Sequence, residues 1–257
     1  VASITPVVVD PETTYLILGV TYSYDSTATT KSITDLNALV DTTLSSYNTT
    51  NLNTFNSPFR HSQLTGLIDD TDTSILMNTT TVTMAKLFTP TTTESTSYTI
   101  NFNNAFYNPV SGYQNAVIAS TGFYISSAST EYFFDDDGSG NLRIYSIAVG
   151  VKTYYSSEAG TIDYVNGLIT INGILISSVS NVDGVSSTQL RITALSDSND
   201  VVPVRNQLLE IDFTNTTVTS KVDAAATTGV GYTTTTTGTT TSTSVNSTKS
   251  TTTSSGY

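Results

Sequence analysis

TYLILGVTYSY, at residues 14–24, begins the stretch of sequence that decides the fold. Aromatic and β-branched side chains dominate it, and such side chains suit a pleated, half-buried surface. We therefore expect a strand here. Similar side chains return at residues 75–88, where we expect a second strand.

The sequence between these two strands has the period of a helix. From residue 30 onward, apolar side chains recur at every third or fourth position, which places them on one face of a helix. They are Ile33, Leu36, Val40, Leu44 and Tyr47. Ser32 with Asp35 in the same turn is a shortened capping-box pattern at the start of this helix.

A shorter helical pattern follows Pro58. Apolar residues at positions 64, 67 and 68 share one helical face, although Gly66 weakens the helix. The acidic residues that follow it are Asp69, Asp70 and Asp72. The predicted order over residues 14–88 is thus strand, helix, short helix and strand.

Beyond residue 98 the sequence is typical of β structure. Candidate strands cover residues 98–102, 116–124, 132–134, 142–149, 152–155, 168–171 and 189–194. Asn166-Gly167 separates two β-type runs and predicts a hairpin with a two-residue type I′ turn, which needs positive φ at both central positions. Asn172-Gly173 and residues 182–185 predict further turns.

These patterns predict an α+β chain that is predominantly β. A strand-helix-helix-strand module is expected at residues 1–90, a β-rich module at 91–223, and an extended Thr/Ser-rich tail at 224–257. Such a tail buries too little apolar surface to offset the entropy of ordering it. We expect residues 224–257 to run across partner chains, or else to form an arm packed on their own domain.

Composition excludes several classes of function. The formal net charge is -12 and only 12% of residues are charged, so nonspecific attraction to nucleic acid or to an anionic membrane is not expected. The chain has no Cys, which excludes disulfides and thiolate chemistry. No apolar stretch approaches the roughly 20 residues that span a bilayer, and no signal peptide is expected at Val1.

One acidic loop partly matches a calcium-binding motif. Asp135, Asp137, Ser139 and Gly140 fit the first half of an EF-hand loop. The match fails at the twelfth position, where Ser146 replaces the bidentate Glu, and the flanking sequence is typical of strands. We therefore interpret the loop as the turn of a β-hairpin.

The remaining candidates for chemistry also have structural interpretations. His61 is the only His of the chain, and its neighbour Ser62 cannot face it on a helix, so we expect a helix-start or packing role. The cluster Asp69, Asp70 and Asp72 is interpreted as a turn after the short helix. We predict no catalytic, cofactor-binding or metal-ligating residue, and no enzymatic activity.

The phrase FRHSQL at residues 59–64, followed by residues 68–75, carries a resemblance to a known family. The chain resembles the baseplate wedge proteins of T-even-like contractile-tailed bacteriophages, in the baseplate J-like family. Residues 6–12, 135–145 and 202–209 fit in the same order, and the resemblance spans residues 3–219. It implies that the chain corresponds to the carboxyl-terminal part of a longer protein.

The resemblance implies a structural role in the tail baseplate of the virion, after assembly in the host cytoplasm. It further implies contacts between copies around a sixfold inner ring, contacts with other wedge and hub proteins, and a part in the rearrangement that triggers sheath contraction. The alternative is a receptor- or glycan-binding adhesin or tail-fibre module, which also has few charges and many Thr and Tyr. The helices expected within residues 14–88 favour the baseplate, and a β-rich hydrolase lacks an assembled catalytic set.

Overall fold

The computed structural model describes residues 12–126, 129–182, 185–204 and 207–228, and this part of the chain is mostly β. Strands β1 (Glu12–Tyr24) and β2 (Ile75–Phe88) form the predicted antiparallel pair, with Leu18 opposite Val82. Alternate side chains of β1 are buried, as expected for a strand with one face on the core. Both predicted strands are confirmed.

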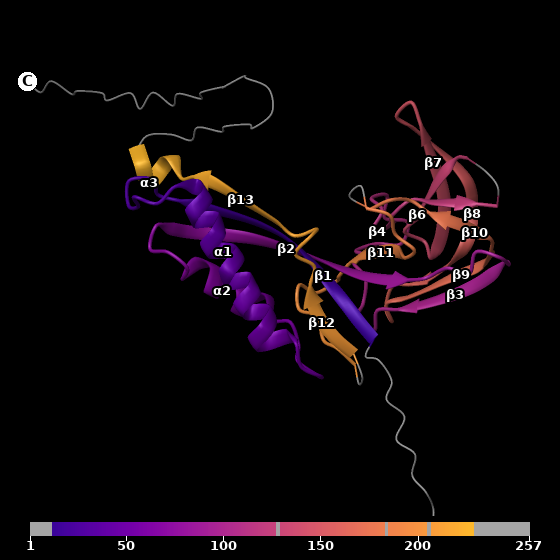
Figure 1. Cartoon of the computed structure of the whole chain (residues 1–257), viewed down its shortest axis with the longest axis horizontal. Helices are drawn as coiled ribbons and strands as arrows, with labels where there is room; N and C mark the ends of the chain where they lie inside the picture. Colours follow the sequence, from indigo (N-terminus) through magenta and orange to yellow (C-terminus); the bar gives the residue numbers. More distant parts are fainter. Residues whose placement is uncertain (1–11, 127–128, 183–184, 205–206, 229–257) are drawn as a thin grey trace, which may run out of the picture.

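Helices lie on one face of this pair (Figure 1). Helix α1 (Ile33–Tyr47) begins with the predicted capping box: the Asp35 amide donates to Ser32 Oγ and the Ser32 amide donates to Asp35 Oδ2, both at 3.2 Å. A π-helical segment, η1 (Asn48–Leu52), extends it. Helix α2 (His61–Asp69) packs on β2, and α1 packs against α2 and β13.

The end of the chain completes the sheet beside β1. Strands β12 (Gln207–Ile211) and β13 (Thr217–Val222) pair in parallel with successive halves of β1. Neither strand was predicted, because each is short and its partner is distant in sequence. The module that begins at β1 thus takes two strands from beyond residue 200, and the predicted boundary near residue 90 stays a prediction.

The rest of the described chain forms a second β-rich region joined to β2 through β11 (Figure 1). Its strands are β3 (Thr96–Asn101), β4 (Ile118–Ser120), β5 (Phe123–Ile125), β6 (Glu131–Asp136), β7 (Asn141–Ala148), β8 (Val151–Asp163), β9 (Leu168–Ile174), β10 (Ile176–Val179) and β11 (Leu190–Leu195). The sheet order is β12-β1-β2-β11-β4-β6-β7-β8-β9-β3, with β5 pairing β6 and β10.

Two local predictions need correction. The strand expected at residues 116–124 is two strands, β4 and β5, with Gly122 between them. The hairpin at Asn166-Gly167 exists, but β8 ends at Asp163 and only Gly167 has positive φ, so the turn is longer than a two-residue type I′ turn. Its Asp163 carboxylate accepts hydrogen bonds from the amides of Val165 and Asn166, which stabilises this wider turn.

Two other turns were predicted from the sequence. Asn172-Gly173 lies inside β9, so the turn predicted there is wrong. Val182 and Val185 exchange two backbone hydrogen bonds of 2.9 Å, and the turn predicted at residues 182–185 falls on residues 183–184, which lie outside the described part.

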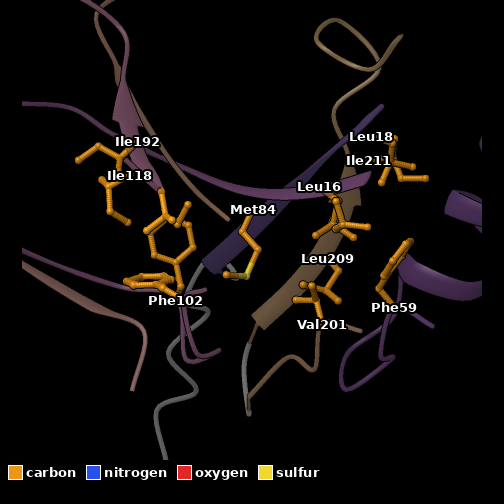
Figure 2. Packing of buried hydrophobic residues seen from close by; sticks show 14 of the residues in the cluster. Leu16, Leu18, Phe59, Met84, Phe102, Ile118, Ile192, Val201, Leu209 and Ile211 are labelled. Atoms are coloured by element: carbon orange, nitrogen blue, oxygen red, sulfur yellow. The ribbon is translucent and has the colours of Figure 1, made fainter. Parts of the chain in front are cut away.

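A continuous hydrophobic core joins the two regions of the sheet. Figure 2 shows the side chain of Met84, on β2, between two groups of buried residues. Phe102, Ile118 and Ile192 lie on one side of it, and Leu16, Val201 and Leu209 lie on the other. Because Met is flexible, its side chain suits an irregular junction of this kind.

The predicted tail begins differently from the expectation. A short helix, α3 (Ala224–Thr228), replaces the first residues of the extended segment. The Asp223 carboxylate accepts hydrogen bonds from the amides of Ala225 and Ala226, as an N-cap does. The prediction for residues 229–257 lies outside the described residues.

Candidate interaction surfaces

The phrase FRHSQL attaches the start of α2 to a distant loop. The Phe59 amide donates to the Val201 carbonyl at 2.8 Å, and the Val201 amide donates back at 3.2 Å. Arg60 Nη1 donates to Asp200 Oδ2 at 2.8 Å, and the His61 amide donates to Asp200 Oδ1 at 2.9 Å. The Arg60 guanidinium holds the pKa of Asp200 below its usual value. This motif therefore has a structural use.

His61 is the first residue of α2, as the sequence predicted. Its Nε2 lies 2.8 Å from the Thr80 carbonyl oxygen, so a protonated Nε2 donates to the backbone of β2. Its neighbour Ser62 is exposed. The ring thus ties the helix to the strand beneath it.

Two of the acidic residues at and after the end of α2, Asp69 and Asp72, have separate partners. Asp69 Oδ1 accepts from Asn78 Nδ2 at 2.7 Å, whereas Asp72 Oδ1 accepts from the Ser74 amide at 2.9 Å. Lys31 Nζ binds the other oxygen of Asp72. Hydrogen bonds from Lys31 and Ser74 lower the pKa of Asp72 to about 2. The predicted turn after the short helix is confirmed.

We expect Lys31→Ala to raise the pKa of Asp72 towards the value of about 3.9 found in unfolded chains. Since the folded pKa is depressed, the stability from Asp72 is present above that value and is lost as pH falls to about 2. In the Lys31→Ala variant, the stability that Asp72 contributes will be lost at a higher pH than in the parent chain. NMR titration of the Asp72 carboxyl measures the shift. Lys221→Ala is the control, because Lys221 makes no ion pair among the described residues; an unchanged Asp72 pKa in Lys31→Ala would contradict the argument.

The partly EF-hand-like loop is the turn of the β6–β7 hairpin, as the strand-like flanks predicted. Gly138 and Gly140 have φ values of +72° and +106°, which L side chains rarely adopt. Asp137 Oδ1 accepts from the amides of Ser139 at 2.7 Å and Asn141 at 3.0 Å. Within the described ranges, no group of three or more His, Asp or Glu side chains is placed to hold a metal ion.

Asp136, in the same hairpin, is buried and fastens three segments together. Its Oδ1 accepts from the amides of Val117 at 2.7 Å and Ile118 at 2.9 Å, and its Oδ2 accepts from the Tyr164 hydroxyl at 2.7 Å. Burial and this hydrogen bond raise the pKa of Tyr164. This contact also draws Tyr164 out of β8, which explains the wider turn that follows Asp163.

Asp135 points to the opposite face of β6 and organises the base of the β7–β8 hairpin. It accepts from Arg143 Nε at 3.0 Å, Lys152 Nζ at 2.8 Å and the Tyr154 hydroxyl at 3.2 Å. Lys152 Nζ lies 3.8 Å from the centre of the Tyr145 ring, a cation–π contact. Although burial opposes it, the hydrogen bond to Asp135 raises the pKa of Lys152. This network fixes the direction of the hairpin.

The tip of that hairpin is apolar and exposed. Ile147, Val149 and Val151, which we call the hairpin tip, are 54%, 103% and 63% exposed. Val149 and Gly150 form a two-residue turn with φ of 51° and 75°. A left-handed conformation costs a β-branched residue about 1–2 kcal/mol, and such strain is concentrated at functional sites. The hairpin tip is therefore a candidate contact.

This turn was not predicted from the sequence. The one signal for it was the gap of two residues between the predicted strands 142–149 and 152–155. We missed it because a type I′ turn normally carries Asn, Asp or Gly at its first central position, where this chain has Val149.

A second candidate surface is a hollow of about 490 Å³ on β1, β2, β11 and β12. Its apolar side chains are Leu87, Val185 and Phe213, all three exposed. Its charged side chains are Arg191, Glu210 and Asp212. Tyr15 also lines it, and burial together with these two carboxylates raises the pKa of the Tyr15 hydroxyl. We call this surface the hollow.

Comparison with known proteins agrees with the resemblance carried by residues 59–75. Residues 12–87 match the family described as baseplate structural protein gp6, C-terminal domain III. This segment contains β1, α1, η1, α2 and most of β2. No curated protein matches the chain. None of the helices in the described ranges is long and apolar enough to cross a membrane. Over residues 12–87 the chain is therefore similar to a C-terminal domain of a phage baseplate structural protein, gp6.

Proposed function

We propose that this chain joins neighbouring wedges into the inner ring of the baseplate and takes part in the rearrangement that triggers sheath contraction. As a baseplate protein it is a component of the virion, with other baseplate components as partners. The observation that carries the proposal is the match of residues 12–87 to a gp6 domain. The helices between β1 and β2 favour this role over the adhesin.

The proposed partners are other copies of this chain around a sixfold ring, together with wedge and hub proteins. The role is structural and needs no cofactor, nucleic acid or membrane. Two features support it: the described residues expose a strained apolar hairpin tip, and their sheet carries an open hollow. Stable interfaces bury about 1,200–2,000 Å² in total, and apolar burial contributes about 25 cal/mol per Å² before association entropy is subtracted.

Electron microscopy of the native particle, with symmetry analysis, tests the proposed place in the assembly. A sixfold ring of copies around the tail axis is the expected result. A threefold spike that projects from the tail, or a chain that occurs only as a monomer, would contradict the ring and favour the adhesin.

We expect deletion of residues 229–257 to weaken assembly of the ring and leave the isolated fold intact. A Thr-rich segment has little apolar surface to contribute to its own fold, but it can add main-chain hydrogen bonds to a neighbouring sheet. The deletion retains α3, whose Ala224 side chain is buried. Thermal unfolding of the purified variant checks the fold, and electron microscopy checks the ring. Unchanged assembly would show that this segment does not join copies.

A further inference from the structure

We propose that the open edge of β13 accepts part of residues 229–257 as an added strand, which the neighbouring copy supplies in the proposed ring. The donor rests on the proposed role in a ring, whereas the accepting edge belongs to the fold of each chain. In an addition of this kind, main-chain hydrogen bonds provide the affinity, so no large apolar surface is needed.

Among the described strands, β13 pairs with β1 alone, so one of its sides has no strand beside it. One hydrogen bond fixes the direction of its backbone groups: the Asp223 amide donates to the Tyr24 carbonyl of β1 at 2.8 Å. Alternate residues of a strand direct their N–H and C=O groups to opposite sides, so those of Val218 and Ser220 lie on the open side. A row of such groups is a template for another strand.

The other described strands at the ends of the sheet are less suited to accept a strand. The outer side of β12 is covered by η1, because the Ile211 amide donates to Asn48 Oδ1 at 2.8 Å. The pairings of β3 and β10 each contain a register shift, and such an irregularity interrupts the edge and twists it away. In contrast, β13 pairs with Gly19–Tyr24 of β1 without a shift, which leaves a regular outer edge.

Residues 229–257 have a sequence that suits an added strand. Thr dominates this segment, and β-branched side chains favour strands. It contains no Pro, so it can donate backbone hydrogen bonds along its whole length. On β13, Thr217 and Thr219 are exposed, and Thr–Thr pairs stabilise adjacent strands.

The charge of this segment differs from that of the rest of the chain. All 21 acidic residues precede residue 229, and Lys249 is the only charged side chain after it. Copies of a chain with a formal net charge of -12 repel one another, but residues 229–257 carry none of the negative side chains responsible. Strand β13 has no acidic residue either, and its Lys221 is exposed. The segment can therefore approach this edge on another copy without repulsion between carboxylates.

The length of the segment allows it to reach another copy. It follows α3, which lies at the end of β13 (Figure 1). Extended at roughly 3.3 Å per residue, residues 229–257 span about 95 Å, whereas the six residues of β13 need about 20 Å. Exchange of an identical element between copies is a low-cost route to an assembly. Each copy then donates a segment to one neighbour and accepts one from another, a head-to-tail contact that closes into a ring when the rotation permits it.

Amide hydrogen exchange, followed by NMR, tests the accepting edge without knowledge of the register. The Val218 and Ser220 amides should exchange at least about tenfold more slowly in the whole chain than in a variant without residues 229–257. The amides of Thr219 and Lys221 are the internal control, because they face β1 and should be slow in both chains. The proposal is overturned if the Val218 and Ser220 amides exchange equally fast in both chains, or at the rate of an unfolded chain in the whole chain.

A mixture of two chains identifies the donor. The variant without residues 229–257 is labelled with ¹⁵N and mixed with unlabelled whole chain, so that any added strand on the labelled β13 comes from another copy. We expect its Val218 and Ser220 amides to become about tenfold slower in the mixture. Exchange that stays fast in the mixture, although the same amides are slow in the whole chain, overturns donation by a neighbour.

Ser220→Pro separates the contact from folding. Pro removes an amide hydrogen that lies on the open side of β13, and Pro is tolerated at such positions of edge strands. Association between copies, measured by sedimentation velocity, should weaken about tenfold. Thr219→Pro is the matched control: it removes an amide that faces β1, so it should lower the thermal midpoint much further than Ser220→Pro. Unchanged association in a folded Ser220→Pro chain overturns the proposal.

The outcome is distinguishable from a failure of the proposed function. A ring seen by electron microscopy, with no strand added to β13 in its copies, overturns the contact and retains the ring. Slow exchange of the Val218 and Ser220 amides in the mixture, without a ring in the particle, supports the contact and contradicts the proposed ring.

Discussion

Phe59→Ala is expected to lower the free energy of unfolding by about 3–5 kcal/mol, which is the usual cost of removing a fully buried Phe side chain. Phe59 is 0% exposed, and its ring meets that of Tyr47 edge-on at 5.9 Å between centroids. Its backbone also pairs with Val201, so the cavity would open where the end of α1, the start of α2 and the loop before β12 meet. Urea unfolding of the purified variant measures the loss.

Phe55→Ala is the matched control for this substitution. Phe55 lies in the same connection between η1 and α2, but its side chain is 58% exposed. We expect its replacement to change the free energy of unfolding by less than about 0.5 kcal/mol. Equal losses in the two variants would show that the burial of Phe59 does not determine its contribution.

Local sequence patterns predicted the elements of the first module well. The aromatic and β-branched side chains of residues 14–24 predicted β1, and the helical period that begins at Ile33 predicted α1, because each pattern depends only on neighbouring residues. Ser32 and Asp35 predicted their capping box for the same reason. The phrase FRHSQL lies within the segment that matches the gp6 domain, and its residues hold α2 in place.

Local sequence patterns could not predict which distant strands pair with each other. Nothing in Gln207–Ile211 or Thr217–Val222 indicates that both strands pair with β1, because the partner is at the other end of the chain. Asn48 shows the same limit: its buried Oδ1 accepts from the Ile211 amide at 2.8 Å, and no nearby residue predicts that contact. The hollow escaped prediction for this reason too, since it is formed by four strands that meet only in the fold.

Tyr164 shows how a distant contact overrides local turn chemistry. Asn166-Gly167 favours a two-residue turn, which would place Tyr164 in β8. The Tyr164 hydroxyl instead donates to Asp136, and Gly167 lies so close to Asn104 that an added Cβ would be 2.0 Å from the Asn104 carbonyl oxygen. These two contacts fix the ends of a wider turn.

Asp136→Ala is expected to destabilise the chain by about 3–5 kcal/mol, because it leaves two backbone donors and one hydroxyl without their acceptor. Removal of a buried carboxylate also relieves some cost of desolvation, but the stranded donors outweigh it. The donors belong to Val117, Ile118 and Tyr164. Since β4 and β6 share only the pair Ala119 and Asp135 in their ladder, Asp136 is a main attachment between these strands.

Tyr164→Phe separates the contribution of the Tyr164 hydroxyl from that of the two backbone amides that also donate to Asp136. It removes only the hydroxyl, so we expect a loss of about 1–2 kcal/mol. The raised pKa of Tyr164 adds a dependence on pH: its share of stability is complete below the unfolded value of about 10 and is lost as pH rises above it. Tyr164→Phe should therefore lose less stability than the parent chain above about pH 10. Urea unfolding measures both losses of unfolding free energy. Equal losses for Asp136→Ala and Tyr164→Phe would show that Asp136 stabilises the chain through the Tyr164 hydroxyl and not through the amides of Val117 and Ile118.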